Sequence, residues 1–127
     1  MLVFNSLLKY PKGTLESILI EAYSSFHERY PEYREENLKN YNECDTFFYE
    51  NPKIGESCSF VSEYEGKIAG MCCWDPRENP TVIIGHNCIL PKLKGKGLGT
   101  ASRNAMSCDQ RRIMRIMTES LYYKGIK

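Results

Sequence analysis

The chain has 127 residues, of which 42% are hydrophobic and 26% charged, and this balance predicts one compact domain, residues 1–127, with its own core. A formal net charge of +1 argues against a general nucleic-acid-binding protein. No apolar run approaches the length of a transmembrane helix, and the first residues lack the basic-then-apolar order of a signal peptide. We therefore expect a protein that binds neither nucleic acid nor a membrane.

The cysteines indicate the compartment. They do not show the spacing of a metal-ligand set, and four of them lie inside apolar, strand-like segments. This distribution is typical of small buried thiols in a reducing environment. We therefore expect a cytoplasmic protein without a bound metal. The six residues are Cys44, Cys58, Cys72, Cys73, Cys88 and Cys108.

The first third of the chain predicts a strand followed by two helices. Residues 2–8 have the composition of a strand. Thr14 is suited to cap a helix, and apolar residues then recur at i, i+3 and i+4 from Leu15 to Tyr30. Pro31 is expected to end this helix, and a second helix is predicted over residues 35–48.

The middle of the chain changes to a strand pattern. Asn51-Pro52 is expected to end the second helix. Residues 58–64 and 67–74 then read as two strands, and Glu65-Gly66 between them is a turn typical of an antiparallel hairpin. Turn-forming residues at 75–80 lead into the next strand.

The most informative pattern lies in residues 81–100. Residues 81–90 are mostly apolar and strand-like, Pro91 ends the strand, and residues 94–99 read Lys-Gly-Lys-Gly-Leu-Gly. From Leu98 onward the apolar residues take helical spacing. A strand, a glycine-rich turn and a helix in this order direct backbone N–H groups and the positive end of a helix dipole toward one point, which suits a phosphate group. The glycines match neither a Walker loop nor a Rossmann fingerprint.

The charges divide the chain at the same place. Residues 1–91 contain 8 Lys and Arg against 14 Asp and Glu, a net charge of −6, whereas residues 92–127 contain 9 against 2, a net charge of +7. A basic region that starts at the glycine-rich turn suits a polyanionic ligand such as coenzyme A.

The segment from Ile89 to Gly99 resembles motif A of the GCN5-related N-acetyltransferases, the GNAT family, with the whole motif at residues 87–100. In this family an apolar strand and a proline precede a Gly-x-Gly-x-Gly loop with a basic residue inside it. The predicted order of strand, two helices, hairpin, strand, loop and helix is similar to the start of that fold, so the resemblance covers about residues 1–100. It implies an α+β fold of the acyl-CoA N-acyltransferase type, in which helices flank a mixed, mostly antiparallel sheet.

The resemblance also implies an activity and a site. The activity is transfer of an acetyl group from acetyl-CoA, a co-substrate, to an amine on a small molecule or a peptide N-terminus. Backbone groups on the strand would hold the thioester and the pantetheine arm, and the loop would hold the pyrophosphate. The residues implied are Asn87, Cys88, Ile89, Lys94, Gly95, Lys96, Gly97, Leu98, Gly99 and Thr100.

Catalytic residues are less well indicated. Many relatives place a glutamate on or near this strand, which has none here. His86 is the candidate general base, because an imidazole of pKa about 6.5 is suited to proton transfer; a histidine packed in the sheet is the alternative. Glu63 and Glu65 lie near the hairpin turn, where we expect their side chains to be solvated and not catalytic. Cys88 is better explained as a small buried strand residue than as a cysteine that carries the acyl group. Tyr122 and Tyr123 are aromatic, but nothing in the sequence brings them to the thioester.

After about Thr100 the sequence departs from the family pattern, and residues 101–127 are arginine-rich and short. The usual C-terminal strands are expected to be missing, so the strand at 81–90 would lie at an open sheet edge that invites pairing with another chain. A homodimer or larger assembly is therefore expected. Two other interpretations stay open: a non-catalytic CoA-binding or interaction domain derived from this fold, and an unrelated α+β phosphate-binding module.

Overall fold

The computed structural model describes residues 1–77 and 83–105. Its centre is a sheet in the order β1-β2-β3-β4, in which each of these neighbouring strands pairs antiparallel with the next. The predicted α+β fold is thus confirmed, and the sheet, predicted as mixed, is antiparallel throughout the described strands. The strands are β1 (Leu2–Asn5), β2 (Ser59–Tyr64), β3 (Lys67–Asp75) and β4 (Ile83–Ile89).

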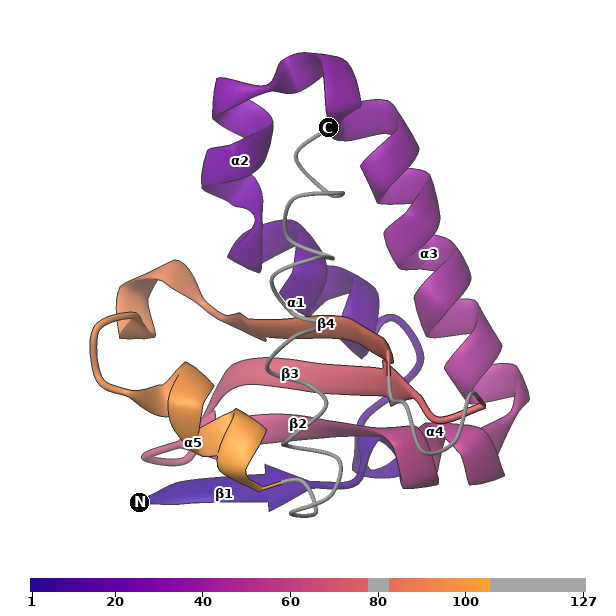
Figure 1. The fold of residues 1–127 in the computed structure, drawn as a ribbon, viewed down its shortest axis with the longest axis vertical. Coiled ribbons are helices and arrows are strands. Elements are labelled where there is room, and N and C mark those ends of the chain that lie inside the picture. Colours follow the sequence, from indigo (N-terminus) through magenta and orange to yellow (C-terminus); the bar gives the residue numbers. More distant parts are fainter. Residues whose placement is uncertain (78–82, 106–127) are drawn as a thin grey trace.

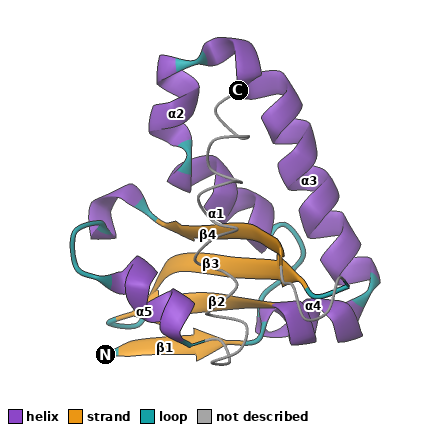
Figure 2. Ribbon diagram, viewed as in Figure 1, coloured by secondary structure: helices purple, strands orange, loops and turns teal. Residues whose placement is uncertain are grey.

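Helices cover both faces of the sheet. Figure 1 shows α5 across one face, while α1 lies behind the sheet and α2 and α3 extend beyond the β4 edge. Figure 2 shows the same layers by secondary structure, with short loops between them. The helices are α1 (Thr14–Ala22), α2 (Ser24–Arg29), α3 (Arg34–Glu50), α4 (Pro52–Cys58) and α5 (Leu98–Asn104), with 3₁₀ turns at Leu7–Lys9, Pro31–Tyr33 and Pro91–Leu93.

The first strand is shorter than predicted. It ends at Asn5, and the chain turns into a 3₁₀ helix at Leu7. The Ser6 hydroxyl accepts a hydrogen bond from the Leu8 N–H at 3.2 Å, which caps this turn. The turn places Leu7 in the core with 0% of its surface exposed, a position that a continued edge strand would not give it.

The helix predicted from Thr14 to Tyr30 is broken at Tyr23. The backbone of Tyr23 has φ −100° and ψ 15°, outside the helical range, and separates α1 from α2. The break lets the side chains of α1 pack on the sheet while α2 leads away from it (Figure 1). Pro31 does end α2, as predicted, and begins the next turn.

Helix α4 was not predicted. Asn51-Pro52 does end α3, but Pro52 is also the first residue of the next helix. Proline suits that position because its missing N–H is not needed there and its φ is already helical. Gly55 allows the close approach of α4 to α3, since a Cβ there would lie 2.9 Å from the Phe48 carbonyl oxygen.

The hairpin between β2 and β3 is confirmed at Glu65-Gly66, whose φ values of 52° and 78° are those of a tight two-residue turn. The pairing of β3 with β4 contains a bulge, because Cys73 faces His86 whereas Trp74 faces Ile84. Gly85 is the extra residue. It turns His86 toward the helices, while Ile84 packs with Cys72 on the opposite face.

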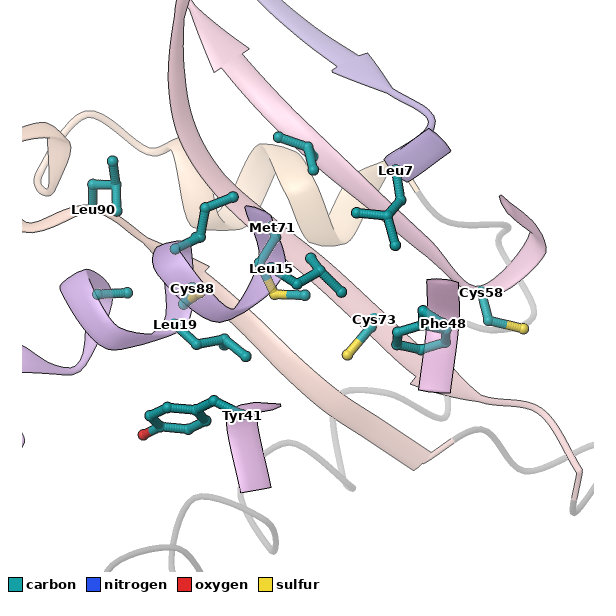
Figure 3. Close-up of a cluster of buried hydrophobic side chains, with 13 residues drawn as sticks. Leu7, Leu15, Leu19, Tyr41, Phe48, Cys58, Met71, Cys73, Cys88 and Leu90 are labelled. Carbon is teal, nitrogen blue, oxygen red and sulfur yellow. The ribbon is translucent and has the colours of Figure 1, made fainter. Parts of the chain in front are cut away.

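The main core lies between the sheet and the α1–α3 layer (Figure 3). Leu15 and Leu19 of α1 and Met71 of β3 are each at most 1% exposed. A smaller cluster on the other face holds α5, since Leu98 packs there with Ala69 and Ile89. The position of α5, and with it the preceding loop, is therefore fixed by burial of Leu98 against β3 and β4.

Candidate functional site

A cleft of about 440 Å³ opens where β4, the glycine-rich loop and the α1–α2 break meet. Residues 87–89 of β4 form one wall, and the loop that leads into α5 forms another. These segments lie far apart in the sequence and are brought together by the packing of α1 and α5 on opposite faces of the sheet (Figure 1). The lining residues are Ala22, Tyr23, Asn87, Cys88, Ile89, Leu93, Lys94, Gly95, Gly97, Leu98, Gly99 and Thr100.

Two glycines shape the loop. Gly95 and Gly97 have φ values of 85° and 75°, which non-glycine residues rarely adopt. A Cβ added at either would meet no protein atom within 4 Å, so the space beside them is open. The two glycines therefore allow the backbone of the loop to turn, and they leave that backbone accessible to a ligand.

The Asn87 side chain joins the strand to the helix that follows the loop. Its Nδ2 donates a hydrogen bond to the Gly99 carbonyl oxygen at 3.3 Å. Gly99 also lies close to Ile89, since a Cβ there would be 3.8 Å from Ile89 Cγ1. This link holds the start of α5 against β4 and fixes the width of the cleft.

A match with a protein-family description agrees with this architecture. Residues 15–106 match the Acetyltransferase (GNAT) family, a span that includes the hairpin, β4, the loop and the described part of α5. The chain belongs to the GNAT acetyltransferase family. No curated protein matches the chain.

All the residues that the sequence predicted to bind the cofactor line the cleft, with the exception of Lys96. The Lys96 side chain is exposed to solvent and is not part of the lining. Lys94 lines the cleft. Ala22, Tyr23 and Leu93 also line it and were not predicted. In the sequence, Ala22 and Tyr23 fit the apolar face of one long helix, and no local signal distinguishes a core position from a cleft wall there.

His86 lies beside the GNAT cleft and outside its lining. Its Nδ1 is hydrogen bonded to the Tyr23 hydroxyl at 3.1 Å, and the Tyr41 ring packs edge-on at 5.9 Å between centroids. Burial lowers the pKa of His86 to about 4, so its imidazole is neutral at pH 7. The arrangement is that of a packed, hydrogen-bonded histidine.

Cys88 lines the cleft as a buried thiol. Burial raises its pKa to about 12, an effect only partly offset by a backbone hydrogen bond at Met71 and by the charge of Lys94. A thiol with this pKa carries almost no thiolate at neutral pH and is a poor nucleophile. The cysteines that the structure describes form no disulfide with one another, and no group of possible metal ligands forms among the described residues.

The two glutamates near the hairpin lie away from the GNAT cleft. Glu63 accepts hydrogen bonds from the Tyr10 hydroxyl and, at 3.2 Å, from Asn5 Nδ2. Glu65 pairs with the N-terminal amine of Met1 at the surface. Both side chains have structural partners and neither lines the cleft.

Tyr122 and Tyr123 lie outside the described residues. None of the described helices is long and apolar enough to cross a membrane.

Proposed function

We propose that the chain transfers an acetyl group from acetyl-CoA to an amine, on a small molecule or a peptide N-terminus, by direct attack of the amine on the thioester. The observation that carries the proposal is the cleft between β4 and the glycine-rich loop in a chain of the GNAT family. Its ends differ in chemistry, because the loop with Lys94 follows the C-terminal end of β4, whereas the Tyr23 hydroxyl lies beside His86, on the N-terminal side of the strand residues that line the cleft.

The loop fits the diphosphate of coenzyme A. The open space beside Gly95 and Gly97 would let phosphate oxygens reach the backbone N–H groups, and the Lys94 ammonium would add a favourable charge. Any side chain at these glycines would extend into that space. The residues assigned to the cofactor are those predicted from the sequence, with Lys96 contributing through charge alone.

Strand β4 fits the thioester arm. Within the described sheet, β4 pairs on one side with β3 only, so the N–H and C=O groups on its outer side are not used by a described strand. Because pairing alternates along an antiparallel strand and the Leu90 N–H bonds to Ala69, the outward groups are those of Asn87 and Ile89, on either side of Cys88. They suit the amides of a pantetheine arm in the manner of an added strand. When bound, the cofactor supplies the activated acyl group, and the protein supplies its position.

The acceptor amine must be neutral to attack, although a free alkylamine has a pKa of about 10. His86 was predicted as the base, and its pKa of about 4 makes proton uptake costly at neutral pH. We assign His86 instead to holding Tyr23 through the hydrogen bond between them. If His86 were the base, His86→Ala would lower turnover by about 100-fold or more with unchanged cofactor affinity; our assignment predicts altered stability and acyl-CoA preference instead.

A non-catalytic CoA-binding domain is the second candidate. The observation in its favour is that the titratable side chains described in the cleft lining are Tyr23, Cys88 and Lys94, and burial raises the pKa values of the first two. The Tyr23 phenol and the Cys88 thiol therefore stay protonated at neutral pH and do not act as bases there.

Two measurements test the proposal. Isothermal titration calorimetry with acetyl-CoA, and with ATP as a control polyanion, should show saturable binding of acetyl-CoA only. A thiol-release assay across a panel of small amines and peptide N-termini should then show turnover. Binding without turnover would support the non-catalytic domain, and absence of binding would reject both functions.

We further propose a cytoplasmic homodimer or larger assembly. The described cysteines form no disulfide with one another, which supports a reducing compartment. The edge position of β4 in the described sheet supports pairing with a second chain along residues 83–86, which do not line the cleft. Light scattering at micromolar concentration tests the assembly, and a monodisperse monomer would reject it.

A further inference from the structure

Tyr23 forms the inner end of the cleft. Along β4 the lining consists of Asn87, Cys88 and Ile89, and the glycine-rich loop follows the C-terminal end of that strand. His86, the residue of the strand that precedes Asn87, is not in the lining, and the Tyr23 hydroxyl lies 3.1 Å from its Nδ1. The cleft therefore ends against the Tyr23 side chain.

The Tyr23 ring is held from several sides. It stacks on Tyr41 with ring centroids 5.7 Å apart and 27° between planes, and Tyr41 in turn packs edge-on against His86. The Tyr41 hydroxyl is hydrogen bonded to His27 Nε2 at 3.1 Å. Burial raises the pKa of Tyr23 well above its ordinary value, so the phenol stays protonated and keeps its hydrogen bond at neutral pH. Moving this ring aside would break several contacts at once.

The residues next to Tyr23 leave little room beyond it. Ala22 and Cys88 are 5% and 7% exposed and belong to the main core. Tyr23 itself packs against that same core. A ligand group at this end of the cleft would meet small, apolar, closely packed side chains and one large aromatic ring, with no charged side chain among these three.

We propose that Tyr23 limits the acyl group of the thioester to short chains such as acetyl and propionyl, by closing the cleft with a ring that His86 and Tyr41 hold in place. The inference rests on the proposed function, since it assumes that an acyl-CoA lies along β4 with its diphosphate at the loop. It assigns Tyr23 as the residue that determines acyl-chain length and His86 as the residue that positions it.

The test measures binding of acetyl-, butyryl- and hexanoyl-CoA by isothermal titration calorimetry, for the parent chain and for three variants. Tyr23→Ala opens the end of the cleft. Tyr23→Phe keeps the ring and loses the hydroxyl. Ile20→Ala is a control on the exposed side of α1, at a residue 39% exposed. Circular dichroism and thermal melting establish that each variant is folded.

The parent chain and Ile20→Ala should prefer acetyl-CoA to hexanoyl-CoA by at least tenfold. Tyr23→Ala should raise the affinity for longer chains by about fourfold for each methylene that enters the space of the ring. Tyr23→Phe keeps the ring but loses the hydrogen bond to His86, so its chain-length preference should fall between those of the parent chain and Tyr23→Ala. Turnover with the same thioesters should follow the same order.

Two results would overturn the inference. One is a folded Tyr23→Ala variant with an unchanged chain-length preference. The other needs no variant: a parent chain that binds hexanoyl-CoA as tightly as acetyl-CoA has no end wall at Tyr23. Absence of binding of every acyl-CoA to the parent chain is a distinct result, and it would reject the proposed function itself.

Discussion

Two helices of this chain begin after a glycine with a left-handed backbone, and their first turns differ in what they contact. Before α1, Gly13 has φ 100°, and the buried carboxylate of Asp45 accepts hydrogen bonds from the N–H groups of Gly13 and Glu16 at 3.0 to 3.2 Å. Before α5, Gly97 has φ 75°, and no side chain of the described residues caps the helix.

The two helix starts differ in whether their first N–H groups already have a side-chain partner. The first N–H groups of any helix lack partners within the helix. At α1 they are satisfied by Asp45, which is 1% exposed and ties α3 to α1. At α5 the corresponding groups face a cleft that Lys94 also lines. The first helix start therefore contributes to stability, whereas the second is the start that we propose binds the diphosphate of acetyl-CoA.

The largest effect is expected at the filled helix start. Asp45→Ala should lower the free energy of unfolding by about 2–3 kcal/mol, because it removes a buried carboxylate and leaves two partly buried N–H groups without partners. Glu43→Ala, which removes only an exposed pair with Lys39 at 4.0 Å, is the control and should cost less than about 0.5 kcal/mol. Urea denaturation measures both. A loss below about 1 kcal/mol for Asp45→Ala would show that the two helix starts do not differ as described.

At the open helix start, the effect should fall on binding. Gly97→Val should weaken acetyl-CoA binding by at least about 100-fold, since a branched side chain would fill the space of the diphosphate. Gly66→Val is a matched control, because Gly66 has a similar φ of 78° and similarly open surroundings in the distant hairpin. Both variants should lose about 1–2 kcal/mol of stability from backbone strain. Equal affinities for the two folded variants, measured by calorimetry, would contradict the account.

The low pKa of His86, beside the cleft, should make the free energy of unfolding depend on pH. The pKa of His86 is about 4 in the folded chain, against about 6.5 when unfolded. The unfolded chain therefore takes up a proton first as the pH falls, and a stability contribution of about 3 kcal/mol, present above pH 6.5, is lost between pH 6.5 and 4. His27, whose pKa burial also lowers, contributes in the same direction.

The measurement is the free energy of unfolding at several pH values for the parent chain and His86→Gln. The variant should show a shallower slope between pH 6.5 and 4, whatever its stability at pH 7. An identical slope would mean that His86 is protonated equally in both states.

The smallest effect is expected from the loop lysines. Lys94→Gln and Lys96→Gln should each weaken acetyl-CoA binding by about 1 kcal/mol or less, because both side chains are exposed and screened by salt. Lys94 should contribute more than Lys96, since only Lys94 lines the cleft. Titrations at 50 and 300 mM salt should show a weaker salt dependence for each variant. Affinities equal to the parent at low salt would show that the loop charges do not act on the ligand.

The loop and the hairpin could be predicted from sequence because their signals are local. Glu65-Gly66 and the glycines at 95 and 97 adopt the backbone angles that their residue types favour. The strands around them are marked by apolar composition. Pro52 misled the prediction because proline is compatible with both the end of one helix and the start of the next.

The remaining features depend on contacts between distant residues. The break at Tyr23 is accompanied by a hydrogen bond to His86, 63 positions later. The cap of α1 comes from Asp45, which the sequence places in the middle of an ordinary polar helix. The low pKa of His86 follows from its burial against Tyr23 and Tyr41, and burial is set by the assembled fold.

The most direct test compares the two helix starts in a single experiment. Amide resonances of a ¹⁵N-labelled chain are followed during titration with acetyl-CoA. The account predicts saturable shifts at Gly95, Gly97 and Gly99, and essentially none at Gly13 and Glu16, whose N–H groups are already bonded to Asp45. Loop resonances that stay unchanged at saturating acetyl-CoA, or equal shifts at both helix starts, would contradict it.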